Sequence, residues 1–156
     1  MKLQNIYLIK DIFSVKEVKK IFKLSKPLVE KIPGCPGLQS YPILQDKKQF
    51  NFVIQKLLEV FDKQKYKVSA AWINFTSGDY INWHNHPPTK YSVVYFLKNK
   101  DSLGTMFKVK DEIIKTTMKE NSAILFPSKY IHSCPISDSK IDRWSIVLDL
   151  IENENN

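Results

Sequence analysis

The stretch SGDYINWHNHPPTKYSVVYFL, residues 77–97, is typical of the whole second half of the chain. It holds two short runs rich in Val, Ile, Tyr, Phe and Trp, at 79–86 and 91–97, separated and preceded by Ser, Gly, Asp and Pro. β-branched and aromatic residues favour strands, whereas Gly, Pro and Asp favour turns. The stretch therefore predicts two short strands that are bounded by sharp turns.

Further short runs of this kind fill the chain after Lys65, and we expect additional strands at 66–75, 104–110, 122–126, 130–134 and 143–151. Before Lys65 the apolar residues recur at helical spacing instead. The sequence Ser14-Val15-Lys16-Glu17 is typical of a capping box, which predicts a helix that continues through Leu24. A second helix is expected from about Lys47 to Phe61.

Seven or eight short strands that follow two helices predict a mainly β fold, either a sandwich or a jelly roll with the helices packed on one sheet. A chain of 156 residues with 43% hydrophobic residues is most simply one domain with its own core. We therefore expect a single domain over 1–156, with a helical N-terminal part at 1–65 and a jelly-roll core at 66–151.

Cysteine usage and the N-terminal segment predict where the protein works. Cys35 and Cys134 lie far apart and follow no metal or redox spacing, so we expect reduced thiols. Lys10 and Asp11 interrupt the segment where a signal peptide needs its apolar run. No apolar run approaches the roughly 20 residues of a membrane span. We expect a cytoplasmic protein with no membrane partner, and the sequence leaves its oligomeric state open.

The net charge of +8 raises the question of a nucleic-acid partner. The cations are 23 lysines and a single arginine, spread over the whole chain with acidic residues between them. Proteins that recognise nucleic acids lean on arginine for bidentate contacts to bases and phosphates. We therefore expect a solvated lysine surface that attracts small anions, and no nucleic-acid partner.

The three histidines of the chain, His84, His86 and His132, fit a single metal site. Residues i and i+2 of a strand point to the same face, so His84 and His86 can share a metal, and a jelly roll can bring His132 across to them. The alternative is that they are ordinary core or surface histidines. Three facial ligands leave open positions for a cosubstrate and dioxygen. Because only neutral imidazole binds a metal, affinity should fall as the pH drops through the histidine range.

Arg143 is the only arginine of the chain. A planar guanidinium binds a carboxylate through two parallel hydrogen bonds, which a lysine ammonium cannot do. Ser145 lies on the same face of the predicted strand and can add a hydroxyl to the same carboxylate. The alternative is a surface salt bridge with Asp142 or Asp138. The pattern thus predicts a carboxylate anchor beside the metal site.

A series of short motifs covers about half of the chain, from Asn74 to Asp149. They are Trp72-Ile73-Asn74, Gly78, His84-Asn85-His86-Pro87, Ser92-Val93-Val94-Tyr95, Phe126-Pro127-Ser128, His132 and Arg143-Trp144-Ser145. In order and spacing this series resembles the iron(II)- and 2-oxoglutarate-dependent oxygenases, especially a small branch that is common in bacteriophages. For a phage-encoded protein the expected location becomes the cytoplasm of the host.

The resemblance implies a double-stranded β-helix that binds iron(II), 2-oxoglutarate and dioxygen. It makes His84 and His132 two of the iron ligands. His86 stands where most of the superfamily carries Asp or Glu, and we expect it to complete a three-histidine site. A neutral third ligand leaves more positive charge on the iron.

By the same resemblance, Arg143 binds the distal carboxylate of 2-oxoglutarate, with Ser145, Tyr95 and Asn74 as weaker candidate contacts. The implied reaction converts 2-oxoglutarate to succinate and carbon dioxide while it hydroxylates a peptide, prolyl residues included, or a small molecule. Ascorbate is a candidate additional cofactor. No catalytic side chain is expected beyond the metal site.

Two other interpretations stay open at this point. One is a cupin-type metalloenzyme that uses the three histidines without 2-oxoglutarate, and the other is a jelly-roll binding module without catalysis. Arg143 separates the oxygenase from the cupin-type enzyme, because only the 2-oxo acid requires a carboxylate anchor, whereas iron binding separates both enzymes from the binding module. Substrate contacts are expected in the loop Pro87-Pro88-Thr89-Lys90 and around Asp111–Lys119, since loops at the mouth of a barrel set specificity.

Overall fold

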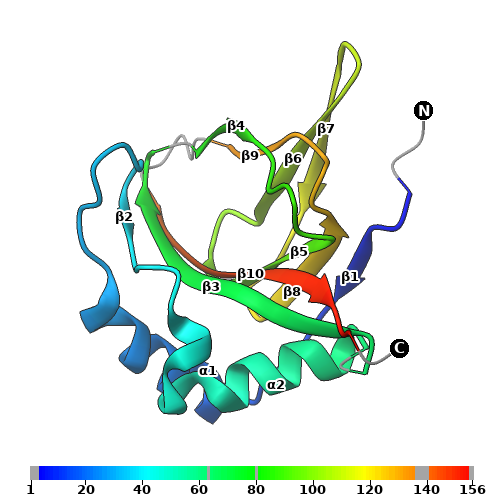
Figure 1. Cartoon of the computed structure of the whole chain (residues 1–156). Helices are drawn as coiled ribbons and strands as arrows, with labels where there is room; N and C mark the ends of the chain where they lie inside the picture. The colour runs from blue at the N-terminus through cyan, green and yellow to red at the C-terminus, as the bar shows by residue number, and fades with distance from the viewer. Residues whose placement is uncertain (1–3, 63, 80, 136–140, 155–156) are drawn as a thin grey trace.

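Two antiparallel β-sheets face each other in the computed structural model, which describes residues 4–62, 64–79, 81–135 and 141–154. The larger sheet has six strands and the smaller has four. The two α-helices lie against the larger sheet, on the side away from the smaller one (Figure 1). The arrangement is a jelly roll of the double-stranded β-helix type. It confirms the predicted mainly β fold with N-terminal helices packed on one sheet.

The strands pair with partners that are distant in the sequence. The larger sheet, in the order β1-β8-β5-β10-β3-β2, contains β1 (Tyr7–Ile9), β2 (Leu38–Gln39), β3 (Tyr66–Ser77), β5 (Tyr91–Asn99), β8 (Ser122–Pro127) and β10 (Asp142–Glu152). The smaller sheet, in the order β4-β9-β6-β7, contains β4 (Ile81–His84), β6 (Leu103–Val109), β7 (Glu112–Thr117) and β9 (His132–Cys134). Strand β10 lies inside the larger sheet and pairs with β3 and β5 on its two sides.

The N-terminal part forms the two expected helices. They are α1 (Val15–Ser25) and α2 (Asn51–Val60), with the 3₁₀ helices η1 (Lys26–Leu28), η2 (Leu44–Asp46) and η3 (Lys48–Phe50) between them. The predicted capping box is present, since the Ser14 N–H donates to Glu17 Oε2 at 2.7 Å and the Glu17 N–H donates to Ser14 Oγ at 3.3 Å. The second helix begins with the tighter turns of η3, so α2 starts after the expected Lys47.

Alternate residues of β10 face two different environments. Trp144, Ile146, Leu148 and Leu150 point toward the helices and belong to the main hydrophobic core. Arg143, Ser145, Val147 and Asp149 point the other way and line a cavity between the sheets. The period of two along a strand accounts for this division. One strand therefore forms the core on one face and a wall of the cavity on the other.

A second, smaller core lies beside the cavity. It consists of the buried residues Phe96, Phe107, Met118, Ile124 and Phe126. The rings of Phe107 and Phe126 meet edge to face with their centroids 5.0 Å apart. Because Phe107 comes from the smaller sheet and Phe126 from the larger, this cluster joins the two sheets next to His132.

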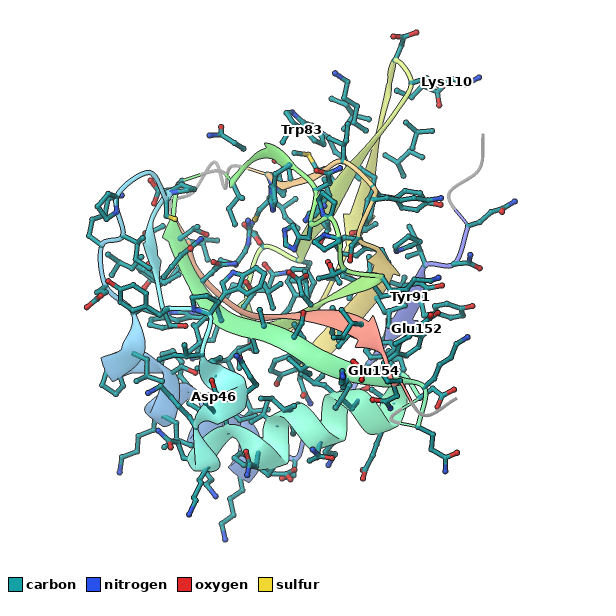
Figure 2. The ribbon with its side chains drawn as sticks, in the orientation of Figure 1. Asp46, Trp83, Tyr91, Lys110, Glu152 and Glu154 are labelled. Atoms are coloured by element: carbon teal, nitrogen blue, oxygen red, sulfur yellow. The ribbon has the colours of Figure 1, made fainter. Side chains whose placement is uncertain are left out.

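Three short strands differ from the sequence-based expectation. Strands β1, β2 and β7 were not predicted, and β7 falls within the segment Asp111–Lys119, where we expected a substrate-contacting loop. Instead this segment pairs with β6 in a hairpin that projects from the body of the protein, with Lys110 at its tip (Figures 1 and 2). Exposed and half-buried residues alternate along β7, and this weak apolar signal explains why the strand was missed.

Among the residues that the structure describes, no helix is both long enough and apolar enough to cross a membrane.

Replacing Ser14 by Ala should lower the free energy of unfolding by about 1 kcal/mol, since the Ser14 side chain satisfies one of the free N–H groups at the start of α1. Urea denaturation followed by circular dichroism measures this change. Lys16→Ala, an exposed position in the same turn, is the matched control and should stay within about 0.5 kcal/mol of the unmodified protein. Equal stability of the Ser14→Ala protein and the unmodified protein would show that the capping box does not stabilise the fold.

Candidate metal centre

A cavity of about 410 Å³ opens between the two sheets. Its walls come from strands of both sheets and from the loop at residues 34–36. All three histidines line it, together with Asn74, Arg143 and Ser145. The structure thus brings six of the seven predicted site residues to one cavity, although they come from four strands and the segment that follows β4.

The three imidazole rings converge on one point. The ring centroids of His84 and His132 lie 4.3 Å apart, those of His84 and His86 4.9 Å apart, and those of His86 and His132 5.0 Å apart. One potential ligand atom from each histidine lies within 4.8 Å of the other two. His84 and His132 are neighbours because they are paired residues of β4 and β9. Such a cluster can hold one metal ion.

His86 reaches this cluster by a route that the sequence did not predict. We expected His84 and His86 on one face of a strand, but β4 ends at His84, so this part of the prediction is wrong. The chain turns after β4, and the backbone N–H of His86 donates to the carbonyl of Ser128 at 3.0 Å. The ring still stacks on that of His84, at an interplanar angle of 27°.

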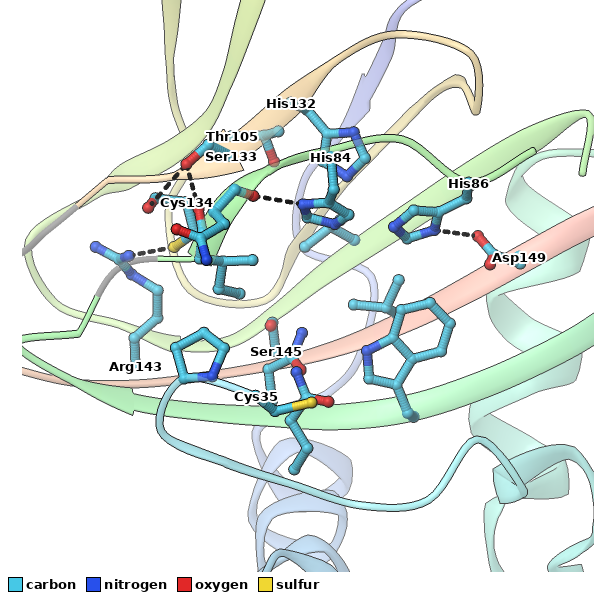
Figure 3. Close-up of a pocket in the computed structure, with 18 of the residues that line it drawn as sticks. Cys35, His84, His86, Thr105, His132, Ser133, Cys134, Arg143, Ser145 and Asp149 are labelled. Carbon is cyan, nitrogen blue, oxygen red and sulfur yellow. Dashed lines mark hydrogen bonds and ion pairs between the residues drawn. The ribbon is translucent and has the colours of Figure 1, made fainter. Parts of the chain in front are cut away.

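Each of the three rings has a hydrogen-bond partner at Nδ1, and Figure 3 shows the bond between His86 and Asp149. His84 Nδ1 lies 2.6 Å from the carbonyl of Asn82, and His132 Nδ1 lies 2.9 Å from the carbonyl of Tyr130. His86 Nδ1 lies 2.8 Å from Oδ1 of Asp149. These partners are acceptors, so each neutral ring carries its proton on Nδ1 and keeps a free lone pair on Nε2. Three Nε2 atoms are therefore available to a metal.

Burial keeps two of these rings neutral. Burial lowers the pKa of His132 to about 3, and it also lowers the pKa of His84. The ring of Phe126 contributes to this burial, with its centroid 4.7 Å from that of His132. Protons should therefore compete with a metal for His84 and His132 only at a pH below the ordinary histidine range. For these two residues, the loss of metal affinity that we expected from the sequence moves to lower pH. Neutral imidazole nitrogens suit a divalent transition metal, so the residues fit such an ion.

Arg143 lies at another part of the cavity wall, and partners hold all three nitrogens of its guanidinium. Nε donates to Oδ1 of Asn99 at 3.1 Å, and one terminal nitrogen donates to Oδ2 of Asp101 at 3.0 Å. The other donates to the carbonyl of Pro135 at 2.9 Å and contacts Cys134 Sγ. Arg143 is 4% exposed, so the ion pair with Asp101 is largely buried.

This ion pair differs from the alternative drawn from the sequence. We considered a surface salt bridge of Arg143 with Asp142 or Asp138, but among the described residues its ion-pair partner is Asp101. Asp138 lies outside the described residues. In the described part of the chain, the partners of Arg143 engage four of the five N–H donors of the guanidinium, and Asp101 offsets part of its charge, so an anion at this wall would meet one remaining N–H of Arg143 unless it displaced a partner.

Asn74 and Ser145 lie side by side, as paired residues of β3 and β10. Both are largely buried and both line the cavity. The side-chain oxygen of Asn74 is buried without a hydrogen-bond partner in the described part of the chain. A buried polar atom without a partner costs free energy, so this oxygen points to a ligand that completes the site.

Tyr95 does not line the cavity. Along β5 the residues Val94 and Phe96 face it, so Tyr95 faces the helices instead. Its ring packs edge to face on Phe13, with the centroids 5.1 Å apart, and its hydroxyl donates to Oδ1 of Asn121 at 3.2 Å. Burial raises the pKa of the Tyr95 hydroxyl. We therefore do not retain Tyr95 as a cosubstrate contact.

Sequence reasoning missed several residues of the cavity. Asp149 is the most important, because its carboxylate binds the ring of His86. Its position six residues after Arg143 on one strand gives it the same parity, and that signal was available in the sequence. Both cysteines, Cys35 and Cys134, line the cavity as free thiols, and burial raises the pKa of Cys134.

Metal-free protein should lose stability as the pH falls from about 6.5 toward about 3. The folded state resists protonation of His132 until about pH 3, whereas the unfolded chain takes up that proton below about 6.5. The unfolded state then binds more protons, so the free energy of unfolding decreases. Between about pH 7 and about pH 5, unmodified protein should lose about 2 kcal/mol more than the His132→Gln variant.

Urea denaturation of both proteins in the presence of a chelator measures this difference. An equal loss in the two proteins would contradict the neutral, buried state assigned to His132.

No family model and no curated protein sequence matches the chain. Its fold is nonetheless similar to solved structures. HygX from Streptomyces hygroscopicus, with nickel, 2-oxoglutarate and hygromycin B bound, superposes with a TM-score of 0.77 at 11% identity, over 96% of this chain and 83% of HygX. SnoN, a non-heme alpha-ketoglutarate-dependent epimerase from nogalamycin biosynthesis, gives 0.75 at 7% identity, over 94% of this chain and 77% of SnoN.

A prolyl hydroxylase from Trichoplax adhaerens, in complex with a peptide fragment of hypoxia inducible factor, gives a TM-score of 0.71 at 11% identity, over 94% of this chain and 83% of the hydroxylase. At these identities the likeness establishes the fold and not the activity. The chain has the double-stranded β-helix fold of 2-oxoglutarate-dependent enzymes, with its three histidines gathered in the cavity between the sheets.

Proposed function

We propose that the protein is an iron(II)- and 2-oxoglutarate-dependent dioxygenase that hydroxylates a peptide, with prolyl residues as candidates, or a small molecule. The observation that carries this proposal is the convergence of three imidazoles, each with Nε2 free, inside a cavity of this fold. The order of motifs along the chain further supports the small phage-type branch of these oxygenases.

In this proposal His84, His86 and His132 hold iron(II) through Nε2. The three ligands lie on one side of the ion and leave positions open toward the cavity. Bound iron would activate dioxygen, the oxidant of the reaction: one oxygen atom would enter succinate as 2-oxoglutarate loses carbon dioxide, and the other would enter the substrate. The hydrogen bonds at each Nδ1 fix the orientation of the rings, so little reorganisation is needed when the ion binds.

Arg143 is proposed to bind the distal carboxylate of 2-oxoglutarate, with Ser145 and Asn74 beside it. Asn99 and Asp101 fix the guanidinium, which would place the bound anion in a constant orientation. The buried side-chain oxygen of Asn74 has acceptor capacity left, which suits an O–H or N–H donor of a ligand and not a carboxylate oxygen. These three residues are part of a polar lining that also includes Gln39, Thr105, Ser133 and Asp149.

Apolar side chains complete the cavity and would keep water from the reacting groups. Trp72, Val94, Phe96 and Val147 line it between the metal centre and the larger sheet. Exclusion of water strengthens the electrostatic interactions of the site and prevents side reactions. A volume of about 410 Å³ has room for the cosubstrate and for one group of a substrate.

Two of the structural neighbours illustrate the two substrate classes. HygX was crystallised with hygromycin B, a small molecule, and the prolyl hydroxylase with a peptide fragment. In the described part of the chain the loop 87–90 contributes no residue to the cavity lining, and the β6–β7 hairpin contributes only Thr105, near the start of β6. Substrate contacts from the loop or from the outer part of the hairpin would therefore lie outside the cavity, on the route to it.

A second candidate is a three-histidine metalloenzyme of cupin type that does not use 2-oxoglutarate. Two observations favour it: the metal cluster contains no carboxylate ligand, and Arg143 already forms an ion pair with Asp101. Binding of 2-oxoglutarate to the metal-loaded protein separates the two candidates.

Replacing Arg143 by Lys should weaken 2-oxoglutarate binding at least tenfold, a loss of about 1.4 kcal/mol, and leave metal affinity unchanged. Lysine keeps the positive charge beside Asp101 but lacks the planar guanidinium that Asn99, Asp101 and Pro135 hold in a fixed direction, so it would not present an N–H to the carboxylate in the same geometry. Anaerobic calorimetric titration of iron(II)-loaded protein with 2-oxoglutarate measures the change. On exposure to oxygen, the same samples should form succinate, more slowly in the variant.

Lys90→Gln is the matched control, because Lys90 is an exposed cation that pairs with Glu152. It should leave 2-oxoglutarate affinity unchanged. Unchanged affinity in the Arg143→Lys protein would exclude the anchor. Failure of the unmodified protein to bind iron would exclude both enzymatic functions and favour a binding module.

A further inference from the structure

Asp149 is a largely buried acid on the cavity face of β10, and its carboxylate is directed at the metal cluster. One oxygen, Oδ1, accepts hydrogen bonds from His86 Nδ1 and from Ser92 Oγ, both at 2.8 Å. Asp149 is 8% exposed. Among the described residues no lysine or arginine forms an ion pair with it, in contrast to Asp101, which pairs with Arg143.

A carboxylate in this position is costly unless something compensates its charge. The partners that the structure gives it are a hydroxyl and an imidazole. A divalent ion on the far side of that imidazole would supply the positive charge that the carboxylate lacks. The arrangement therefore indicates a carboxylate that acts on the metal through one ring.

His86 differs from the other two histidines in how its ring is held. His84 and His132 bond through Nδ1 to the carbonyl two residues earlier in their own segments. His86 lies beyond the end of β4, and its Nδ1 bonds instead to Asp149, which belongs to the opposite sheet. Ser92 Oγ lies 3.4 Å from the same Nδ1, so without Asp149 only this longer contact would remain among the described residues to orient the ring.

A buried network holds Asp149 in turn. Ser92 Oγ donates to Asp149 and lies 3.0 Å from Ser128 Oγ. The carbonyl of Ser128 accepts from the backbone N–H of His86 at 3.0 Å. Ser92 and Ser128 are fully buried. The ring and the backbone of His86 are thus tied to β5, to β10 and to Ser128, the residue that follows β8, which fixes the direction in which Nε2 points.

We propose that Asp149 is a positioning residue for the metal centre: it holds His86 with Nε2 toward the ion and supplies the negative charge that three neutral ligands lack. The inference rests on the metal site of the proposed function, but it does not require that 2-oxoglutarate binds. Hydrogen bonding of a carboxylate to Nδ1–H also makes Nε2 a stronger donor to the metal.

Nickel(II) alone is a suitable probe, since it binds imidazole nitrogen and is stable in air. Asp149→Asn keeps the size of the side chain and an acceptor oxygen but removes the charge. It should lower nickel(II) affinity by about ten- to a hundredfold in competition with a chelator. Glu152→Gln, which removes an exposed carboxylate from the same strand, is the matched control and should leave the affinity unchanged.

A double-mutant cycle separates positioning from a merely structural contact. In a His86→Ala background, Asp149→Asn should change nickel(II) affinity by less than about threefold, because the ring through which it acts is absent. Urea denaturation of each variant establishes that it is folded. Unchanged affinity in the single Asp149→Asn variant, or an equal loss in both backgrounds, would overturn the proposal.

The same samples, titrated with 2-oxoglutarate after nickel loading, test the proposed function separately. Absence of 2-oxoglutarate binding would remove the oxygenase function and leave the role of Asp149 standing. Absence of nickel binding by the unmodified protein would overturn both.

Discussion

Strand β10 must satisfy two environments at once, and the rest of the structure depends on this constraint. It pairs with β3 and β5 over almost its whole length, so neither edge is free. Its apolar face packs under the helices, and its polar face forms the cavity wall. The two charged residues of that face, Arg143 and Asp149, are about 20 Å apart along the strand. One strand thus places a cation at one end of the cavity and an anion beside the metal cluster.

The electrostatics of the cavity follow from this placement. Burial keeps His84 and His132 neutral, which makes them ligands but leaves the full charge of a metal uncompensated. Asp149 offsets that charge through the ring of His86, and Asp101 offsets Arg143 at the other end. With a metal bound, each of these buried charges would have a partner, as a low-dielectric interior requires. A dicarboxylic acid that bridges the metal and Arg143 would fit this division of charge.

Sequence patterns predicted the fold class, both helices and the convergence of the histidines, because strand periodicity, the capping box and motif spacing are local signals. The sequence patterns failed where the outcome depends on strand register, that is, on which face of a strand a residue occupies and where the strand ends. Tyr95 was expected in the site, but its parity in β5 places it in the core. Asp149 was overlooked although its parity with Arg143 placed it on the cavity face, because parity alone does not show that an acid is buried. His86 was placed on a strand that ends two residues earlier. The buried pairing of Arg143 with Asp101 required three-dimensional contacts.

The most direct test of the account is a crystal structure of the protein loaded with iron(II) under anaerobic conditions. Nε2 of His84, His86 and His132 should each lie about 2.0–2.2 Å from the metal, the usual range for imidazole ligation. The bond between His86 Nδ1 and Asp149 should persist. A metal bound by His84 and His132 alone, with the ring of His86 turned away, would contradict the three-histidine centre and the role assigned to Asp149.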